Sequence, residues 1–215
     1  MSGRVLIADD HGIVRAGLRV VLERAPDLTI AGEAADGREA VEWMASHEAD
    51  VVVMDVAMPG LNGIEAAAQI LRRRPACRVV MLSMHSDETY VLRCLRAGAC
   101  GYVLKESAEG ELIDAVRAAL AGRSYFSPKV RRLLREEHVE ELRSAGGDDP
   151  FETLTERERE VLQLVAEGNT NKEIAARLFL SVQTVETHRK RVIEKLGLRG
   201  TPELVLFAVR RGLVA

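Results

Sequence analysis

The alternation of short apolar runs with amphipathic segments limits the fold of the first half of the chain more than any other feature. Each run is rich in Val, Ile and Leu, and a segment with apolar residues at helical spacing follows it. Such alternation predicts a parallel sheet covered by helices on both faces. The predicted strands are Val5–Ala8, Thr29–Glu33, Val51–Met54, Val79–Leu82 and Gly101–Leu104. The predicted helices are Ile13–Arg24, Arg38–His47, Gly63–Arg73, Glu88–Ala97 and Glu109–Ala121.

The second half of the chain has a different pattern, because no strand candidate follows residue 150. Capping boxes, in which a hydroxyl residue is followed three positions later by Glu, begin at Thr155 and Thr170 and predict two helix starts. We therefore expect a small domain of four helices. They are Glu156–Glu167, Asn171–Leu178, a third that Ser181 caps and that ends near Leu196, and a fourth from Thr201-Pro202 to Arg211.

The segment between the two halves is predicted to be a linker that contains a helix. Ser127-Pro128 is typical of an N-cap followed by the first helical turn. The run from Gly146 to Pro150 ends any helix. We therefore divide the chain into a domain of residues 1–122, a linker of residues 123–150 and a domain of residues 151–215. The apolar residues of the linker helix are Val130, Leu133, Leu134 and Leu142.

Composition excludes several classes of protein. Apolar residues make up 47% and charged residues 29% of the 215 residues, a balance typical of folded globular domains. The longest apolar runs are far shorter than the roughly 18 residues of a membrane span, and the first residues lack the pattern of a secretory signal. The three cysteines lack metal or redox spacing, so we expect buried thiols in a cytoplasmic protein.

Polar side chains stand where four predicted strands end. They are Asp9 and Asp10, Asp55, Ser83 and Lys105. The carboxyl ends of parallel strands meet at one edge, where such sheets bind ligands. Clustered carboxylates repel one another unless a cation neutralises them, and oxygen ligands suit Mg²⁺. We therefore predict a magnesium site with Asp55 as the nucleophile toward a phosphoryl group, Lys105 as the phosphate partner and Ser83 as a hydroxyl donor that moves toward it.

Three segments of the first domain contain the predicted site residues. They are Val5-Leu6-Ile7-Ala8-Asp9-Asp10-His11, Val53-Met54-Asp55-Val56-Ala57-Met58-Pro59-Gly60-Leu61-Asn62-Gly63 and Gly101-Tyr102-Val103-Leu104-Lys105. Together these segments resemble the receiver domain of response regulators. The resemblance implies a flavodoxin-like, doubly wound (βα)5 fold and phosphorylation of Asp55 by a sensor histidine kinase. It also implies that Asp10, Asp55 and the backbone carbonyl of Ala57 bind Mg²⁺ directly, that Asp9 does so largely through water, and that the rotamer of Tyr102 follows Ser83.

Three residues beside this predicted site bear on how long a phosphoryl group survives there. Met84 follows Ser83 where the family commonly has a small residue, and Ala57 and His85 flank the site. The family relates such positions to the lifetime of the phosphoryl group. We therefore hypothesise an altered rate of autodephosphorylation, which Met84→Ala and His85→Ala variants would test.

The helix that Ser181 caps has the properties of a DNA recognition helix. With the helix before it, it forms a predicted helix-turn-helix in a region that is mildly basic, whereas residues 1–122 are acidic. Hydroxyls and amides near a helix start bind phosphates, and Lys and Arg add affinity that is independent of base sequence. The candidate DNA-contacting residues are Lys172, Gln183, Thr184, Thr187, Lys190 and Arg191. Val182, Val185, Val192 and Leu196 are predicted to pack on the opposite face.

The pattern from Leu154 to Leu196 resembles the LuxR-type domain, and with the receiver it resembles the NarL/FixJ class. The resemblance implies that Thr187 and Lys190 face the major groove of DNA, while Thr184 and Lys172 contact phosphates. Glu186 stands where many members have a basic residue. It either reads a cytosine amino group or pairs with Lys190, and we favour the pairing.

These patterns together predict a transcription factor that phosphorylation of Asp55 switches, and that is not an enzyme. An aspartyl-phosphate phosphatase is one alternative, but Ala57 stands where such enzymes have a second Asp. An adaptor whose helical domain binds protein is another. A homodimer on two half-sites, enhanced by phosphorylation, is expected. Its suggested interface in the second domain is the helix Pro202–Arg211 with Val205, Leu206 and Val209, and in the receiver it is the first and fifth helices by resemblance.

Overall fold

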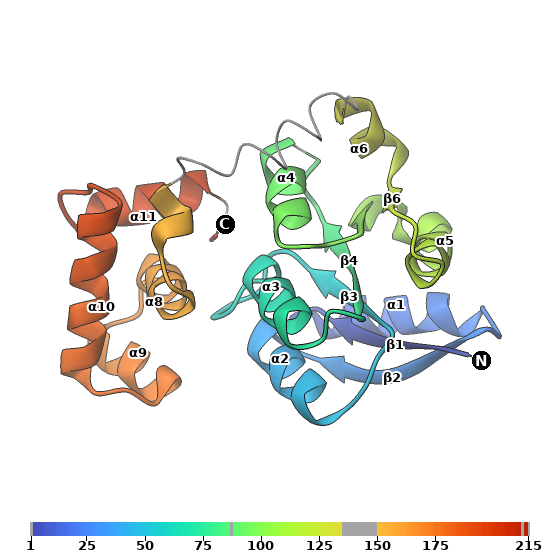
Figure 1. Ribbon diagram of the computed structural model, residues 1–215, viewed down its shortest axis with the longest axis horizontal. Helices are drawn as coiled ribbons and strands as arrows, with labels where there is room; N and C mark the ends of the chain where they lie inside the picture. Colours follow the sequence, from blue (N-terminus) through green and yellow to red (C-terminus); the bar gives the residue numbers. More distant parts are fainter. Residues whose placement is uncertain (1, 87, 135–149, 212, 215) are drawn as a thin grey trace. The chain divides into compact units, whose positions relative to one another are not determined.

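The computed structural model describes residues 2–86, 88–134, 150–211, 213 and 214, and it divides into two compact units, residues 1–144 and 145–215. The first unit contains a six-stranded, all-parallel sheet of order β2-β1-β3-β4-β5-β6 (Figure 1). The five predicted strands are confirmed, with ends that differ by at most two residues, and β6 was not predicted. The strands are β1 (Gly3–Ala8), β2 (Leu28–Ala34), β3 (Val51–Asp55), β4 (Arg78–Ser83), β5 (Gly101–Leu104) and β6 (Tyr125–Phe126).

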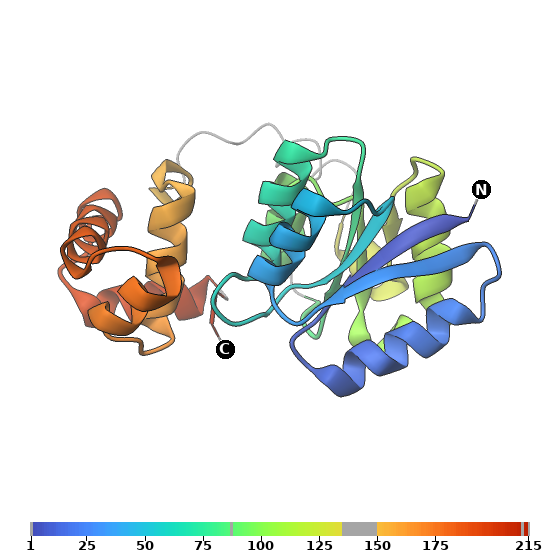
Figure 2. The same ribbon diagram turned by 90° about the horizontal axis from the view of Figure 1, so that it is seen from below.

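Helices cover both faces of this sheet (Figure 2). Val5 and Ile7 of β1 pack in one core with α1 (Gly12–Glu23) and α5 (Ala108–Leu120). Their neighbours Leu6 and Ala8 pack in a second core with α2 (Gly37–Ser46), α3 (Gly63–Arg73) and α4 (Glu88–Arg96). Burying a Val, Ile or Leu side chain contributes about 1.5–3 kcal/mol. Because alternate residues of one strand enter two cores, the buried parts of the central strands, such as Val5–Ala8, Val51–Met54 and Val79–Leu82, are apolar without interruption.

The strand order places a binding crevice at the carboxyl ends of β1 and β3. The chain leaves β1 to form β2 on one side and then returns to form β3 on the other. At this reversal the connecting segments diverge to opposite faces and leave space between them. The residues that follow β1 and end β3 are Asp9, Asp10 and Asp55.

The first part of the predicted linker belongs to the first unit. β6 adds to the edge of the sheet beside β5, and α6 (Pro128–Leu133) follows it. Val130 and Leu134 are buried in the same core as α4. Ser127 is the N-cap residue of α6 and Pro128 is its first residue, as predicted, although the Ser127 hydroxyl bonds to β5 and α5 and not to the start of α6. Leu142 and the glycine-containing break before Pro150 lie outside the described residues.

The second unit is helical in its described part, as predicted. It consists of η2 (Pro150–Thr153), α8 (Glu156–Ala166), α9 (Asn171–Leu178), α10 (Val182–Lys195) and α11 (Thr201–Arg210). Both capping boxes form, at Thr155 with Glu158 and at Thr170 with Glu173. Phe151 of η2 is buried in the core of this unit, although the sequence pattern placed it at a domain edge.

In the described part of the chain, no helix combines the length and the apolar character that crossing a bilayer requires.

Candidate functional site

The predicted acidic residues meet at the carboxyl ends of β1 and β3. Asp9, Asp10, His11 and Asp55 each place one potential ligand atom within 4.8 Å of the others. Asp9 is completely buried, Asp55 is nearly so, and Asp10 is partly exposed. Asp9 is fixed by the backbone N–H of His11, which donates to its Oδ1 at 2.8 Å. Buried carboxylates this close together repel one another, so the cluster favours a bound cation.

Lys105 supplies a positive charge to this cluster. Its Nζ lies 2.7 Å from Asp9 Oδ2 and 2.9 Å from Asp55 Oδ2. Burial lowers the pKa of Lys105, but its close contact with the Asp9 carboxylate and the charge of Asp55 raise it more, and the net shift is upward. Lys105 is therefore an ammonium group held between two carboxylates. It is the first residue of η1 (Lys105–Ser107), the turn that follows β5.

Asp55 has the environment of a perturbed carboxylate. Burial raises its pKa to about 6, and the negative charges of Asp9 and Asp10 act in the same direction, while Lys105 opposes them. Gly63 at the start of α3 lies against the backbone of Asp55, where a Cβ would collide with the Asp55 carbonyl oxygen. The glycine in the predicted motif is therefore explained by the close approach of α3 to the end of β3.

The residues present fit a magnesium ion. Asp9 Oδ2 is buried and accepts no hydrogen bond of ordinary geometry, although Lys105 Nζ lies 2.7 Å from it. An additional cation would satisfy this oxygen. The carboxylates of Asp9, Asp10 and Asp55 are the hard oxygen ligands that Mg²⁺ prefers. Ala57, the predicted source of a backbone ligand, is exposed two residues after Asp55.

The predicted switch residues Ser83 and Tyr102 are joined through His85. The backbone N–H of His85 donates to Ser83 Oγ at 3.0 Å. Its carbonyl oxygen accepts from the Tyr102 hydroxyl at 2.7 Å, and the Tyr102 ring is buried. The His85 ring also stacks on Tyr90 of α4, with centroids 4.6 Å apart. The sequence placed His85 beside the site but gave no sign that its backbone connects these two side chains.

Met84, the residue between Ser83 and His85, has a different environment. It is 73% exposed. Its side chain is therefore largely in contact with solvent and does not pack in the receiver cores. Whether it changes the lifetime of a phosphoryl group at Asp55 stays a prediction.

The cysteines carry none of this chemistry. Cys77 and Cys94 are buried as expected, whereas Cys100 is only partly buried. Burial raises the pKa of the Cys77 thiol to about 11 and that of Cys94 to about 12. Both are therefore protonated near neutral pH and are poor nucleophiles.

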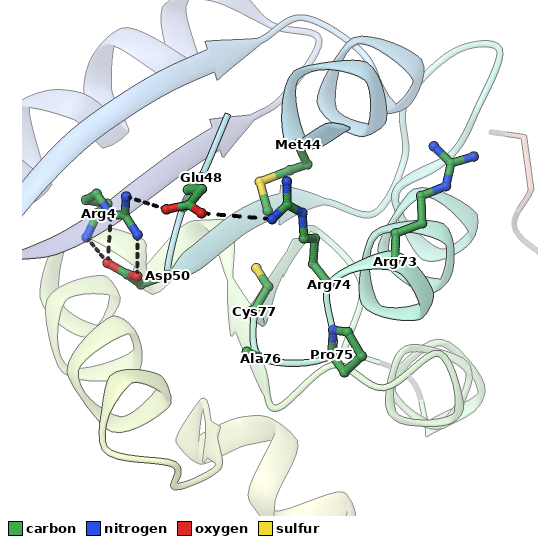
Figure 3. Close-up of a pocket in the computed structure, with 10 residues that line it drawn as sticks. Arg4, Met44, Glu48, Asp50, Arg73, Arg74, Pro75, Ala76 and Cys77 are labelled. Atoms are coloured by element: carbon green, nitrogen blue, oxygen red, sulfur yellow. Dashed lines mark hydrogen bonds and ion pairs between the residues drawn. The ribbon is translucent and has the colours of Figure 1, made fainter. Parts of the chain in front are cut away.

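A pocket of about 330 Å³ lies at the opposite edge of the sheet, where β1, β3 and β4 begin (Figure 3). Arg4 bonds to Asp50 and to Glu48 there, and Glu48 also lies 4.0 Å from Arg74. These charges largely neutralise one another. The pocket contains none of the predicted site residues, so we do not assign it a function.

The helix-turn-helix of the second unit is formed by α9 and α10. Phe179 ends α9 in the left-handed conformation, with φ of 54°, and Ser181 caps α10 by accepting from the Thr184 N–H at 3.0 Å. Val185 and Val192 are buried as predicted, whereas Val182 is exposed and does not pack in the core. The exposed candidates are Lys172, Gln183, Thr187, Lys190 and Arg191, and Thr184 is partly buried.

Ion pairs and hydrogen bonds set the position of α10 within its unit. Lys195 Nζ lies 2.7 Å from the Glu158 carboxylate of α8. Arg189 donates to Asn171 Oδ1 of α9 at 3.0 Å and also bonds to Thr201 of α11. Sequence reasoning missed Arg189, because a basic residue in a basic helix gave no sign of an internal role.

The structure does not show the predicted pairing of Glu186 with Lys190. Lys190 Nζ lies 3.8 Å from Glu194, one turn further along α10. Glu186 is exposed on the same helix.

Comparisons with known proteins identify both units. The family described as response regulator receiver domain matches residues 5–117, and the family described as bacterial regulatory proteins, luxR family, matches residues 152–208. The oxygen regulatory protein NreC of Staphylococcus carnosus is 40% identical over 98% of this chain and 99% of its own length.

Solved structures agree with these matches. RcsB in a complex with DNA is 30% identical, with a TM-score of 0.59 over 97% of this chain and 98% of RcsB. The isolated receiver domain of RcsB from Salmonella enterica, solved with the phosphomimetic BeF3⁻, is 30% identical with a TM-score of 0.59, over 63% of this chain and all of that one. The chain therefore belongs to the NarL/FixJ class of response regulators, transcription factors that join a receiver domain to a LuxR-type DNA-binding domain.

Proposed function

We propose that Mg²⁺-dependent phosphorylation of Asp55 by a sensor histidine kinase switches DNA binding by the second unit. The observation that carries this proposal is the position of Lys105 Nζ, within 3 Å of both Asp9 and Asp55 in a buried acidic cluster at the reversal of strand order. Such an arrangement combines a nucleophilic carboxylate, a cation and ligands for a metal.

In the proposed reaction an Asp55 carboxylate oxygen attacks the phosphorus of a phosphohistidine. The bond between that oxygen and phosphorus forms while the bond between phosphorus and the histidine nitrogen breaks, and the electron pair leaves with the nitrogen. The Lys105 ammonium, 2.9 Å from Asp55, is placed to stabilise the negative charge of the transferred group. Mg²⁺, held by Asp9, Asp10, Asp55 and the Ala57 carbonyl, would neutralise charge on the phosphoryl oxygens.

The proposed switch uses the contacts of His85. A phosphoryl group on Asp55 offers a stronger acceptor to the Ser83 hydroxyl than the neighbouring groups do. Movement of Ser83 would break its bond with the His85 N–H, and His85 also binds Tyr102 through its carbonyl. The two predicted switch residues are therefore coupled through one backbone segment.

DNA recognition is assigned to α10 with support from α9. Gln183, Thr187, Lys190 and Arg191 lie exposed along α10, and Lys172 lies exposed near the start of α9. We assign Lys172 and Thr184 to phosphates and the other four to the major groove. RcsB, which shares this arrangement of two domains, has been solved in a complex with DNA.

We further propose that the protein dimerises in the cytoplasm. An apolar groove of about 560 Å³ lies along α1 and the start of α5, and Val20 beside it is exposed. On α11, Leu206 and Val209 are also partly exposed. A dimer would present two recognition helices to two half-sites. We keep residues 1–122 as the receiver domain and residues 151–215 as the DNA-binding domain, and residues 123–150 as a linker whose first part packs on the receiver.

We infer a binding switch and not an enzyme, because Ala57 stands where a phosphatase of the aspartyl-phosphate type has its second Asp. The test is the affinity for a duplex selected from a random-sequence library, measured by fluorescence anisotropy with and without phosphorylation. We expect tighter binding by the phosphorylated protein and a steep loss of affinity with salt. Equal affinities of both forms would contradict the switch, and the absence of duplex binding would favour the adaptor.

A further inference from the structure

Ser127 connects the linker to the end of the strand that carries the predicted phosphate partner. It follows β6, which ends at Phe126. Its backbone N–H donates to the Tyr102 carbonyl at 3.0 Å, and its Oγ accepts from the Leu104 N–H at 3.1 Å. Beyond the short β6, the Ser127 hydroxyl thus replaces a strand carbonyl and continues the hydrogen bonding of β5. The two bonds lie at Tyr102 and immediately before Lys105.

The Ser127 hydroxyl also has a strong acceptor for its own proton. It donates to Glu111 Oε2 of α5 at 2.5 Å. Ser107 Oγ lies 3.4 Å from it and bonds to the Leu104 carbonyl at 3.2 Å. Ser127 is 1% exposed and Leu104 is also buried. Removal of the hydroxyl would leave a buried backbone N–H without its acceptor, which is costly.

We propose that Ser127 is a positioning residue for Lys105, so that the geometry of the phosphorylation site depends on the linker. This inference rests on the proposed role of Lys105 in phosphorylation of Asp55. Ser127 lies outside the receiver match, which ends at residue 117. The lysine side chain is long and flexible, so its ammonium can be held 2.9 Å from Asp55 only if its backbone is fixed.

The same contacts connect the linker to the phosphorylation site. Ser127 is the N-cap residue of α6, and the Val130 side chain of α6 is buried beside α4. A displacement of α6 would therefore strain the bond between Ser127 and Leu104. The linker is in this way coupled to the strand that carries both Tyr102 and Lys105.

The test compares full-length wild type, Ser127→Ala, Ser127→Thr and Tyr125→Phe by intact mass, with saturating Mg²⁺ and acetyl phosphate. Tyr125 is the matched control, because it lies in the same linker strand and the same Glu111 carboxylate acts on it, where burial and the negative charge of Glu111 raise the pKa of the Tyr125 hydroxyl. Ser127→Ala should reduce the rate constant of phosphorylation about tenfold. Tyr125→Phe should stay within about twofold of wild type, and Ser127→Thr, which keeps a hydroxyl, should recover most of the rate.

A double variant separates positioning from general damage to the fold. If Ser127 acts through Lys105, Ser127→Ala should reduce the residual rate of Lys105→Ala no further. A wild-type rate in Ser127→Ala, or an equal additional loss in the Lys105→Ala background, would overturn the inference and leave the proposed function intact. A wild type that is not phosphorylated would instead overturn the proposed function and this inference with it.

Discussion

The two units of this protein hold their functional charges in opposite environments. In the receiver unit the carboxylates of Asp9 and Asp55 are buried, and Lys105 lies between them. In the helical unit, Lys190 and Arg191 are exposed on α10. Burial makes every charge depend on its neighbours, so the geometry of the receiver site defines its chemistry. Exposed charged side chains keep their conformational freedom. The surface of α10 therefore defines a face that binds DNA, but it does not specify which side chain contacts which base.

The largest effect should follow from removing the cation of the buried cluster. Lys105→Met leaves Asp9 and Asp55 without their shared partner, and we expect it to destabilise the receiver unit by about 3 kcal/mol. Unfolding can be followed in this unit alone through Trp43, the single tryptophan of the chain. Mg²⁺ should restore more stability to the variant than to wild type. Equal stability of both proteins without Mg²⁺ would show that the cluster is less strongly coupled than its distances indicate.

Acidic groups of the two units should make stability depend on pH with opposite signs. Burial raises the pKa of Asp55 to about 6, so the receiver should lose stability as pH rises from about 4 to 6. Asp55→Asn should remove this loss, which Trp43 fluorescence would report. A loss that persists in Asp55→Asn would assign it to other groups.

In the helical unit, burial raises the pKa of Glu158, but its hydrogen bonds with Lys195 and Thr155 lower it more, and the net shift is downward. The contribution of the Glu158 carboxylate to the free energy of unfolding should therefore be complete above about pH 4.5. It should disappear as the pH falls through the lower pKa that this group has in the folded state. Glu158→Gln should cost about 1–2 kcal/mol at pH 7 and should flatten this acid limb. Far-UV circular dichroism would follow the helical transition, and an unchanged acid limb would refute the assignment.

A smaller effect is expected at Phe179, which ends α9 with a positive φ and is 92% exposed. A glycine adopts this conformation without steric cost, and little buried area is lost. Phe179→Gly should stabilise the helical unit by about 1 kcal/mol. A destabilised variant would mean that the aromatic ring has a contact within the unit that offsets its backbone strain.

The smallest effect on stability is expected from Lys190→Ala on the exposed face of α10. Its pair with Glu194 spans 3.8 Å between exposed side chains, so its loss should change stability by less than about 0.5 kcal/mol. Because Lys190 is assigned to the major groove, binding to the selected duplex should weaken by more than binding to an unrelated duplex. An equal loss on every duplex, with a slope of log affinity against log salt that is shallower by about 1, would instead assign Lys190 to a phosphate.

The fold was predictable where a single pattern decided the structure. Strands buried on both faces have uninterrupted apolar sequences, and the capping boxes of α8 and α9 are local, so both are visible without a structure. β6 has only two residues, Tyr125 and Phe126, and a run this short has no period to detect. It forms because the edge of β5 is available to pair with it.

The candidate site was predictable to the same degree and for the same reason. Strand-end positions brought Asp9, Asp55 and Lys105 together because parallel strands share an edge. The contacts of His85 and Ser127 depend on segments that are distant in sequence. Ser127 precedes a proline and has the local signature of a cap, yet its hydroxyl bonds to β5 and α5, because a tertiary contact satisfies it there. A local sequence pattern cannot predict whether a hydroxyl bonds to the start of its own helix or to a segment that is distant in sequence.

The most direct test of the central claim is the intact mass of the protein after incubation with Mg²⁺ and a small phosphodonor, compared between wild type and Asp55→Ala, followed by sedimentation of both samples. We expect the wild type alone to gain one phosphoryl group and then to sediment as a dimer. Modification of Asp55→Ala to the same extent, or a wild type that stays unmodified, would contradict the assignment of the buried cluster as a phosphorylation site.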